Sequence, residues 1–416
     1  MALRQRRVVI TGLGVVAPKA IGADAFWRNL VRGESAIGSI TSFDTTEFPC
    51  RIGGEVSDFR LADFVRPTRA KHMARFSQFA IAAAKLALDD SRVCLSPTLA
   101  AGTFISFGTS VSGFGPISEG PLVHFRDKGV GAVEPWTALE YPPHAAASYI
   151  AIELGITGQA VSQSSNCCTG LDAIHRAYSE IASGRTSLAI AGSCDTPLYP
   201  APFAAFCALR TLSCRNDVPQ KASRPYDRLR DGIVLSEASA AVVLEELSHA
   251  EARGATIYAS VLGFGAASEA VGMRKGDLSG ALMAKAIRSA FQDAVITPET
   301  IDHINAHGSS LPDYDLCDTN AFKAALGQHA YRIPITSIKS MIGQPISAAG
   351  VLQTVAACKS INTCRIPPTI NQEVADPECD LDYTPNVART ARIRHVLVNC
   401  HSFGGSVAAL VLGPPC

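Results

Sequence analysis

Hydrophobic residues along this chain follow two alternating patterns. Short apolar runs rich in β-branched residues predict buried strands at 8–10, 103–107, 187–191 and 240–244. Between these runs, apolar residues recur with helical spacing at 73–89 and 171–182, and Gly184 stands where a helix C-cap is expected. Strands that alternate with helices predict an α/β fold in which helices cover a parallel or mixed sheet.

The same alternation begins again after residue 246. The predicted elements are a strand, a helix, a short strand that leads into a Gly-Ser loop, and two final strands, at 257–264, 278–294, 301–306, 396–398 and 408–412. Two similar halves are therefore predicted, although the two stretches share too little sequence to establish a repeat.

An early glycine motif has the GxGxxA spacing of a dinucleotide-binding turn, in Gly12-Leu13-Gly14-Val15-Val16-Ala17. Val15, Val16 and Pro18 oppose the helix that a pyrophosphate group would need. We therefore expect a strand that turns back on itself here and no nicotinamide site.

Composition argues against several classes of protein. The 37 Lys and Arg residues equal the 37 Asp and Glu residues, so net charge favours neither a nucleic-acid partner nor a membrane surface. No apolar run reaches the roughly 18 to 20 residues of a membrane-spanning helix, and the segment after basic residues 1–7 does not resemble a signal peptide. The thirteen cysteines form no CxxC pair and lie mostly in apolar runs. We expect no metal site, no disulfide framework and a reducing cytoplasm.

Cys167 is the first candidate for chemistry. It lies in Asn166-Cys167-Cys168-Thr169-Gly170, between a polar run at 162–165 and a predicted helix. Unpaired backbone N–H groups and the positive end of the helix dipole stabilise a thiolate at such a position, which predicts a nucleophilic sulfur at neutral pH. From this segment alone, two buried cysteines that pack a helix start are an equally good interpretation.

Two further stretches place polar side chains among small residues. His307 lies in Asn305-Ala306-His307-Gly308-Ser309-Ser310, where small neighbours would let a ligand approach the ring. Lys339 and Gln344 lie in a tight loop that enters a small-residue helix. On its own, each stretch also fits a structural role.

Taken together, these stretches resemble the β-ketoacyl-ACP synthases, which are thiolase-like condensing enzymes, along nearly the whole chain. The residues that carry the resemblance match the nucleophile motif Cys-x-x-Gly, the first His motif and the Lys motif, in Cys167-Cys168-Thr169-Gly170, His307-Gly308-Ser309-Ser310 and Lys339-Ser340. The opening strand at 7–14 and the stretch from Arg224-Pro225-Tyr226-Asp227 to Glu237 are also similar to the family.

The resemblance implies a duplicated αβαβα layered fold. Its N-terminal half, 1–250, would carry the nucleophile, and its C-terminal half, 251–416, would carry the His and Lys motifs. It also implies a homodimer, or a heterodimer with a related ketosynthase-like subunit. Acyl groups would arrive on the phosphopantetheine arm of an acyl carrier protein, with no cofactor bound to the protein itself.

The resemblance also implies roles for single residues. Cys167 would be acylated, and the backbone N–H groups of Cys167 and Phe403 would form an oxyanion hole. His307 would polarise the thioester carbonyl of the extender or assist its decarboxylation, while Lys339 would set the local field and hold the His-bearing loop. Substrate contacts are expected from Ser309, Phe206 and Ser402, structural support from Glu237, Asp315, Asp318 and Gln353, and an acyl tunnel near Phe107, Phe203 and Phe206.

This chain departs from the family at the reactive site. Gln344 stands where the family has a second His, and Gln353 stands where it usually has a Glu. A carboxamide donates a hydrogen bond but cannot transfer a proton near neutrality. Gln344 could still stabilise an enolate oxygen, so condensation remains possible. We interpret the two changes as a coordinated retuning of the site.

The C-terminal loop also departs from the family. His401 and Ser402 replace a Phe and a Gly, and Leu311 replaces a Thr that would contact the pantetheine arm. Because Ser has fewer accessible backbone angles than Gly, we expect altered substrate handling.

Three functions are consistent with this pattern. The leading hypothesis is a decarboxylative condensing enzyme of a specialised polyketide or fatty-acid pathway, with Cys167, His307 and Gln344 as the reactive set. One alternative is an acyltransferase that passes the acyl group to an amine, hydroxyl or thiol without decarboxylation. The other is a non-catalytic partner subunit resembling a chain-length factor, against which the retained Cys167 argues.

Overall fold

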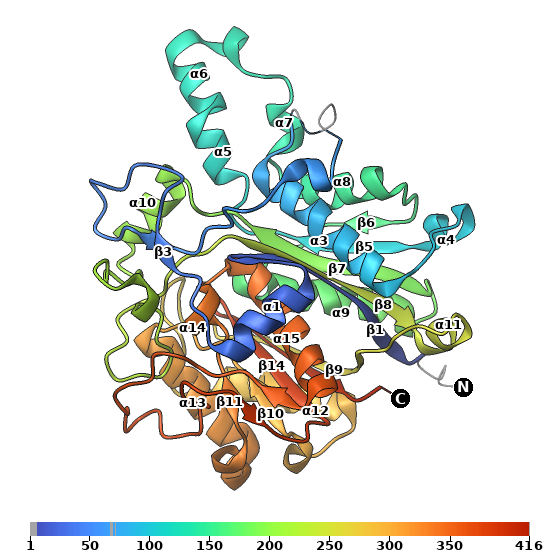
Figure 1. Cartoon of the computed structure of the whole chain (residues 1–416), viewed down its shortest axis with the longest axis vertical. Helices are drawn as coiled ribbons and strands as arrows, with labels where there is room; N and C mark the ends of the chain where they lie inside the picture. Colours follow the sequence, from blue (N-terminus) through green and yellow to red (C-terminus); the bar gives the residue numbers. More distant parts are fainter. Residues whose placement is uncertain (1–5, 67–69, 71, 416) are drawn as a thin grey trace.

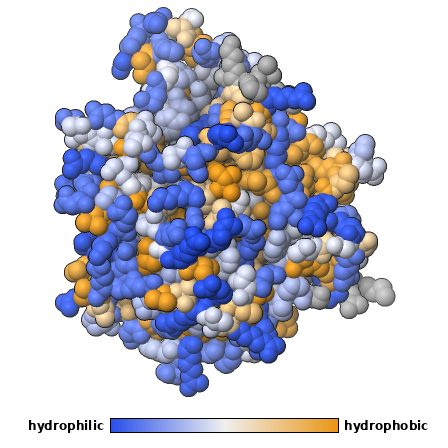
Figure 2. Space-filling model, viewed as in Figure 1, coloured by the Kyte–Doolittle hydropathy of each residue, from blue (hydrophilic) through white to orange (hydrophobic). Residues whose placement is uncertain are grey.

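The computed structural model describes residues 6–66, 70 and 72–415. Residues 1–5 of the basic N-terminal segment and Cys416 lie outside this part of the chain. Figure 1 shows a central sheet with helices on both of its faces. On the face drawn in Figure 2, hydrophilic residues and smaller apolar patches are intermixed. Within the described residues, no helix is both long and apolar enough to cross a membrane.

Strand β1 (Val8–Ala17) contains the early glycine motif and is buried along its whole length. Helix α3 (Arg75–Ser91) crosses it so closely that a Cβ at Gly12 would lie 2.1 Å from Ala87 O, and one at Gly14 would lie 2.0 Å from Ala83 O. The glycines therefore serve helix–strand packing. Strand β2 (Ala20–Ile21) pairs antiparallel with the end of β1, which confirms that the strand turns back on itself.

The central sheet contains the same strand order twice. In the first half, the order from the middle to the edge is β1, β8 (Ala238–Glu246), β7 (Leu188–Asp195), β5 (Phe104–Gly108) and β6 (Ala160–Val161). In the second half it is β9 (Ala259–Ser268), β15 (Ser406–Gly413), β14 (Val396–His401), β10 (His303–Asn305) and β11 (Ile335–Thr336). The predicted α/β fold with a mixed sheet is confirmed.

Strand directions repeat as well. In each half the second strand is antiparallel to both neighbours, and the outer three strands run parallel. The halves join where Val8, Val9 and Ile10 of β1 pair antiparallel with β9. We call the residues through β8 the N-terminal half and those from β9 the C-terminal half.

Helices lie between and outside the two half-sheets. Helix α9 (Thr169–Ala182) packs on β7 and β5, helix α15 (Ala349–Thr363) packs on β14, and these two helices contact each other. Helix α3 covers the outer face of the N-terminal half with α8 (His144–Leu154), and α12 (Ala281–Ala294) covers the outer face of the C-terminal half beside α13 (Pro312–Leu326). Helix, sheet, helix, sheet and helix thus form successive layers, as the thiolase-like resemblance implied.

The remaining helices are short. They are α1 (Ala23–Arg32), α4 (Pro97–Gly102), α5 (Phe114–Glu119), α6 (Pro121–Lys128), α7 (Thr137–Glu140), α10 (Pro200–Ala208), α11 (Leu247–Ala252) and α14 (Lys339–Ile342). Small two-stranded ladders join β3 (Gly38–Ser39) to β4 (Ile52–Gly53) and β12 (Arg365–Ile366) to β13 (Arg389–Thr390).

Glycines set two helix boundaries. Gly184 has φ 78° and its N–H donates to Ile181 O at 2.8 Å, so the predicted end of α9 is confirmed. The helix predicted at 278–294 begins only at Ala281, because Gly280 adopts a left-handed φ of 66° directly before it.

Candidate active site

One cavity with about 320 Å³ of empty space collects residues from both halves of the chain. Its lining residues are Asn166, Cys167, Phe206, Ile233, His307, Ser309, Leu311, Tyr314, Gln344, Ile346, His401 and Phe403. Of the sequence-predicted site residues, it therefore gathers Cys167, His307, Gln344, Phe403, Ser309 and Phe206.

Cys167 lies in a single 3₁₀ turn, Asn166–Cys168, directly before α9. Asn166 has φ 56°, a left-handed backbone conformation that makes the chain turn sharply just before Cys167. Cys167 is only 5% exposed. The sequence placed this residue at a helix N-terminus, and the structure confirms that position.

The predicted thiolate is wrong for the substrate-free protein. Burial raises the pKa of the Cys167 thiol to about 12, and the positive charge of Lys339 opposes this effect only in part. Loss of hydration disfavours the charged sulfur, so the thiol is the favoured form. Acylation of Cys167 would therefore require transfer of this proton to a base.

Gln344 contacts the sulfur directly. Its Nε2 donates to Cys167 Sγ at 3.6 Å, while Gln344 Oε1 is buried without a hydrogen-bond partner in the described part of the chain. The backbone of Gln344 is fixed by its own N–H, which donates to Val234 O at 2.7 Å. The carboxamide thus presents a neutral N–H donor to the position where an acyl group would be attached.

His307 is a buried, neutral imidazole in the same cavity. Burial, the charge of Lys339 and the nearby His401 hold the pKa of His307 well below its usual range. Its Nδ1 has no hydrogen-bond partner among the residues described, and its backbone N–H donates to Asn399 Oδ1 at 3.1 Å. A neutral imidazole has one N–H donor and one acceptor nitrogen, and it lacks the second N–H of the imidazolium form.

Lys339 lies behind His307 and does not line the cavity. Its Nζ donates to His307 O at 2.7 Å and to Gln353 Oε1 at 3.1 Å. Gln353 Nε2 donates in turn to Asn305 O at 2.9 Å and Asn399 O at 3.1 Å, so it links the ends of β10 and β14. Burial lowers the pKa of Lys339. Because Nζ contacts the backbone of His307, Lys339 is a positioning residue.

Two carboxylates of α13 hold the loop that bears His307. Asp315 accepts the backbone N–H groups of Ser309 and Ser310 at 2.8 and 3.1 Å. Asp318 accepts the N–H of Gly308 at 2.8 Å. Burial raises the pKa of Asp315 to about 7, against the opposing effect of Arg230, and burial also raises the pKa of Asp318.

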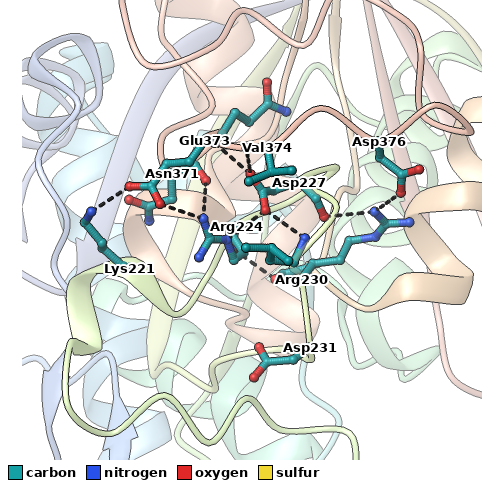
Figure 3. A network of polar contacts seen from close by, with 12 residues as sticks. Lys221, Arg224, Asp227, Arg230, Asp231, Asn371, Glu373, Val374 and Asp376 are labelled. Carbon is teal, nitrogen blue, oxygen red and sulfur yellow. Dashed lines mark hydrogen bonds and ion pairs between the residues drawn. The ribbon is translucent and has the colours of Figure 1, made fainter.

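The stretch from Arg224 to Glu237 contributes to this support. Arg224 forms a buried ion pair with Asp227 at 3.1 Å, and Asp227 also accepts the backbone N–H groups of Glu373 and Val374, both at 2.7 Å (Figure 3). Arg230 pairs with Asp376 and lies 3.5 Å from Asp315. The network therefore links the chain at 371–376 to the His307 loop.

Glu237 lies outside the cavity. It pairs with Arg75 at 2.7 Å and accepts the backbone N–H of Val56 at 2.8 Å. These contacts join α3 to the loop that follows β4.

Ser402 does not contact the cavity, contrary to expectation. The side chain is fully buried, and its hydroxyl accepts the backbone N–H of Cys168 at 2.9 Å and donates to Ser165 O at 2.8 Å. The hydroxyl therefore holds the C-terminal loop against the nucleophile turn. Phe403 does line the cavity, and its carbonyl accepts from Asn166 Nδ2 at 3.4 Å.

The apolar wall was predicted only in part. Phe206 and Leu311 line the cavity, and Phe203 lies behind it against Phe43, with ring centroids 5.6 Å apart. Phe107 does not border it, because β5 turns this side chain into the core cluster beneath α3. The side that a strand residue faces depends on register, which the sequence alone left open.

The sequence interpretation missed several lining residues, namely Asn166, Ile233, Tyr314, Ile346 and His401. His401 had a signal, since an imidazole replaces a family Phe directly beside the cavity loop. Glu269, which contacts His401, had no signal in the sequence, because 132 positions separate the two residues.

Both families that match the chain describe β-ketoacyl synthases. Residues 5–250 match "Beta-ketoacyl synthase, N-terminal domain", and residues 258–373 match "Beta-ketoacyl synthase, C-terminal domain". Together these segments contain Cys167, His307, Lys339 and Gln344.

Similar proteins match over their full length. A 3-oxoacyl-[acyl-carrier-protein] synthase 2 of Synechocystis sp. is 37% identical over 97% of both chains. The tetracenomycin polyketide synthase ketoacyl synthase alpha subunit of Streptomyces glaucescens is 40% identical over 99% of this chain and 98% of its own.

Solved structures agree with these sequence matches. A type II polyketide synthase acyl carrier protein in complex with its ketosynthase has a TM-score of 0.91 and 32% identity, over 99% of both chains. A β-ketoacyl synthase from Burkholderia phymatum has a TM-score of 0.91 and 32% identity, over 98% of this chain and 99% of its own. With its fold, its cavity and both sequence halves matched, this chain belongs to the β-ketoacyl synthase family of acyl-transferring condensing enzymes.

Proposed function

We propose that this protein is a decarboxylative condensing enzyme of a specialised polyketide or fatty-acid pathway. It takes an acyl group onto Cys167 and joins it to a malonyl-type extender held on an acyl carrier protein. The observation that carries the proposal is that the Cys167 sulfur, the His307 ring and the Gln344 carboxamide share one cavity, with Gln344 Nε2 3.6 Å from the sulfur.

In the first step, Cys167 attacks the thioester carbonyl of an acyl group on a phosphopantetheine arm. The new carbon–sulfur bond forms at Cys167, the bond to the pantetheine sulfur breaks, and the pantetheine leaves as a thiol. The backbone N–H groups of Cys167 and Phe403 are proposed to stabilise the oxyanion. The proton on the departing thiol replaces the one that Cys167 gives up.

In the second step, the extender loses carbon dioxide. The electron pair of the broken carbon–carbon bond passes into the thioester as an enolate, whose oxygen can accept from Gln344 Nε2 and from His307. The enolate carbon then attacks the acyl group on Cys167, and the sulfur leaves and is protonated again. The neutral state of His307 suits it to donate a hydrogen bond to the enolate.

The two alternative functions have less support. Acyl transfer without decarboxylation would need no donor at the enolate position, yet Gln344 points its N–H at the sulfur. A non-catalytic partner would need no reactive cysteine, and relatives over the whole chain are named as synthases. Both observations favour condensation.

An acyl carrier protein and a partner subunit are part of the proposal. One similar solved structure is a ketosynthase with its carrier protein, and another is a ketosynthase with a chain length factor. Helices α5 and α6 project at the top of Figure 1 and expose the large apolar side chains of Phe114, Leu122 and Phe125, and Trp136, directly before α7, is exposed as well. Exposed apolar groups of this size support a subunit interface.

The twelve described cysteines are all free, which supports a reducing cytoplasm.

The experiment follows each step separately. The protein is incubated with an acyl group on an acyl carrier protein, and the intact mass is measured, with Cys167→Ala as the control. Malonyl carrier protein is then added and carbon dioxide release is measured. We expect one acyl adduct that Cys167→Ala lacks, followed by carbon dioxide release. An adduct without that release would favour simple acyl transfer, and no adduct would favour the non-catalytic role.

A further inference from the structure

His401 brings a second imidazole to the cavity from the end of β14. Its ring centroid lies 6.2 Å from that of His307 and 4.2 Å from that of Tyr314. His401 Nε2 lies 2.9 Å from Glu269 Oε2, and both side chains are completely buried. The cavity therefore contains an imidazole paired with a carboxylate, although residue 344 is not a histidine.

The surrounding backbone holds the carboxylate of Glu269 in place. The N–H of Asp277 donates to Glu269 Oε2 at 3.1 Å, and the N–H of Glu269 donates to Gly405 O at 2.8 Å. A Cβ at Gly276 would lie 3.0 Å from His401 Cε1, so the chain packs directly onto the ring. A buried charged group is costly unless partners satisfy it, and the carboxylate here has both an imidazole and a backbone N–H.

The other groups around His401 are poor proton acceptors near neutrality. Cys317 Sγ lies 3.8 Å from Glu269 Oε1, and burial raises the pKa of this thiol above its usual range, so it stays protonated. Burial likewise raises the pKa of Tyr314 above its usual range. Asp318 accepts the N–H of Gly308, and Lys339 lies behind His307 with its Nζ on a backbone carbonyl.

The proposed reaction requires a proton acceptor in the cavity. Burial raises the pKa of Cys167 to about 12, so its thiol transfers a proton when it attacks. Gln344 cannot accept this proton, and of the two imidazoles that line the cavity, His401 is the one with a carboxylate partner, Glu269, at 2.9 Å. His401 Nδ1 is buried and has no hydrogen-bond partner within the described chain.

We infer that His401, oriented by Glu269, is the catalytic imidazole that moves the proton during acyl transfer, a function that Gln344 cannot perform. This inference rests on the proposed acylation of Cys167. With Nε2–H donated to Glu269, the lone pair of Nδ1 is free to act as a base, as in other carboxylate–imidazole pairs.

The proton moves in a closed cycle. As the carbon–sulfur bond to Cys167 forms, the thiol proton passes to Nδ1, and the imidazolium is stabilised by the Glu269 carboxylate. As the bond to the pantetheine sulfur breaks, that sulfur takes the proton from Nδ1. His401 ends neutral, Cys167 ends as a thioester, and the pantetheine leaves as a thiol.

The test measures acylation of the full-length protein by an acyl-pantetheine thioester across pH, by intact mass. His401→Gln keeps a donor for Glu269 but cannot transfer a proton, so we expect acylation to slow by about 10²- to 10⁴-fold and its pH profile to change. Glu269→Gln removes the carboxylate that orients the imidazole and stabilises the imidazolium, so acylation should slow in this variant as well.

A relocated imidazole gives an independent check. The double variant with His401→Gln and Gln344→His should regain at least about tenfold of the lost rate, because proton transfer is restored beside the sulfur. His303→Gln, a buried histidine of β10 outside the cavity, is the matched control for effects on folding. Thermal unfolding of each variant is measured in parallel.

Two outcomes overturn the inference and are distinguishable from failure of the proposed function. If the wild-type protein acylates and His401→Gln stays within about twofold with the same pH profile, His401 is not the base. If His401→Gln slows acylation but keeps the pH profile, its role is structural. If the wild-type protein never acquires an acyl group, the proposed function itself is wrong.

Discussion

The two halves of the molecule build the same turn and use it differently. In each half a 3₁₀ turn with a left-handed first residue precedes the central helix: Asn166 at φ 56° before α9, and Ile346 at φ 47° before α15. The middle residue is Cys167 in one turn and Ser347 in the other. Cys167 lines the cavity, whereas Ser347 is fully buried and its hydroxyl donates to Cys194 O at 2.9 Å.

The strand ends differ in the same way. After β5, Thr109 and Ser112 donate their hydroxyls to Asp195 at 2.9 and 2.8 Å, and Asp195 also accepts the N–H of Ser347 at 3.0 Å. After β10, the corresponding loop presents His307 to the cavity. One half thus contributes the proposed nucleophile, Cys167, and the other contributes the imidazole of His307. A duplicated backbone supplies equivalent positions, and hydrogen bonding decides which of them remain free for chemistry.

Exchange of the two turn residues for alanine should separate chemistry from packing most clearly. Cys167→Ala should abolish the acyl adduct, because the sulfur is the attacking atom. Ser347→Ala should keep the adduct and lower the free energy of unfolding by about 0.5–1.5 kcal/mol, because the buried Cys194 carbonyl loses the nearer of its two hydroxyl donors, Ser347 and Ser112. Intact mass and denaturant unfolding measure the two effects. Loss of the adduct in both variants would break the contrast.

His303 of β10 and His307 of the loop that follows this strand form the next pair. His307→Gln should slow condensation by about 10²- to 10⁴-fold, because the imidazole is lost from the reactive site. His303→Gln should retain the rate, because this ring lies outside the cavity, where burial lowers its pKa to about 3. Carbon dioxide release from malonyl carrier protein measures both. If both variants lost the same fraction of the condensation rate, the loss would be due to impaired folding and not to the missing His307 imidazole.

Gln344 tests whether the second half supplies more than the imidazole. Gln344→Ala should permit acylation and slow condensation by about 10²- to 10³-fold, as expected for the loss of one donor to a developing oxyanion. Single-turnover acylation and carbon dioxide release separate the steps. Gln344→His is the companion variant: faster decarboxylation would identify the native Gln as a restraint on that step. An equal loss of acylation would contradict this division of roles.

The protonation state of Cys167 can be followed by alkylation with iodoacetamide. Only the thiolate reacts, and the pKa of Cys167 is raised to about 12. The rate at Cys167 should therefore rise about tenfold per pH unit between about pH 6 and pH 9 without a plateau. Lys339→Met should slow the reaction, because removal of the positive charge raises the pKa of the Cys167 thiol further. Peptide mass mapping isolates this cysteine, and a plateau below about pH 8 would contradict the protonated state.

The smallest expected effect concerns the contact between the halves at Ser402. Ser402→Ala removes the nearer of two acceptors of the Cys168 N–H, the other being Ser165 O at 3.3 Å, and should lower the free energy of unfolding by about 0.5–1.5 kcal/mol. Ser183→Ala, at the exposed end of α9, should stay within about 0.5 kcal/mol. Denaturant unfolding measures both variants. A Ser402→Ala protein as stable as the control would mean that other contacts hold the loop.

The hydrophobic pattern predicted most of the elements because each strand and helix here is buried on a regular period. Strands β1, β5, β7, β8, β9, β14 and β15 and helices α3, α9 and α12 all overlap their predicted ranges. The motif around Cys167 also gave its position before α9, since the turn and helix signals are local. The tight loop before α15 was also predicted from its small residues, and the structure confirms a turn there, at Ile346–Ala348. Its likeness to the Cys167 turn became visible only through the repeated topology.

By itself, the sequence determined the α/β elements, the family and the identities of Cys167, His307 and Gln344, because periodicity and motifs are carried by neighbouring residues. The tertiary structure decided the burial of Cys167, which raises the pKa of its thiol. It also gave Ser402 a hydrogen-bonding role, directed Phe107 away from the cavity and paired His401 with Glu269. These properties depend on burial and on contacts between remote positions, which exist only once the chain has folded.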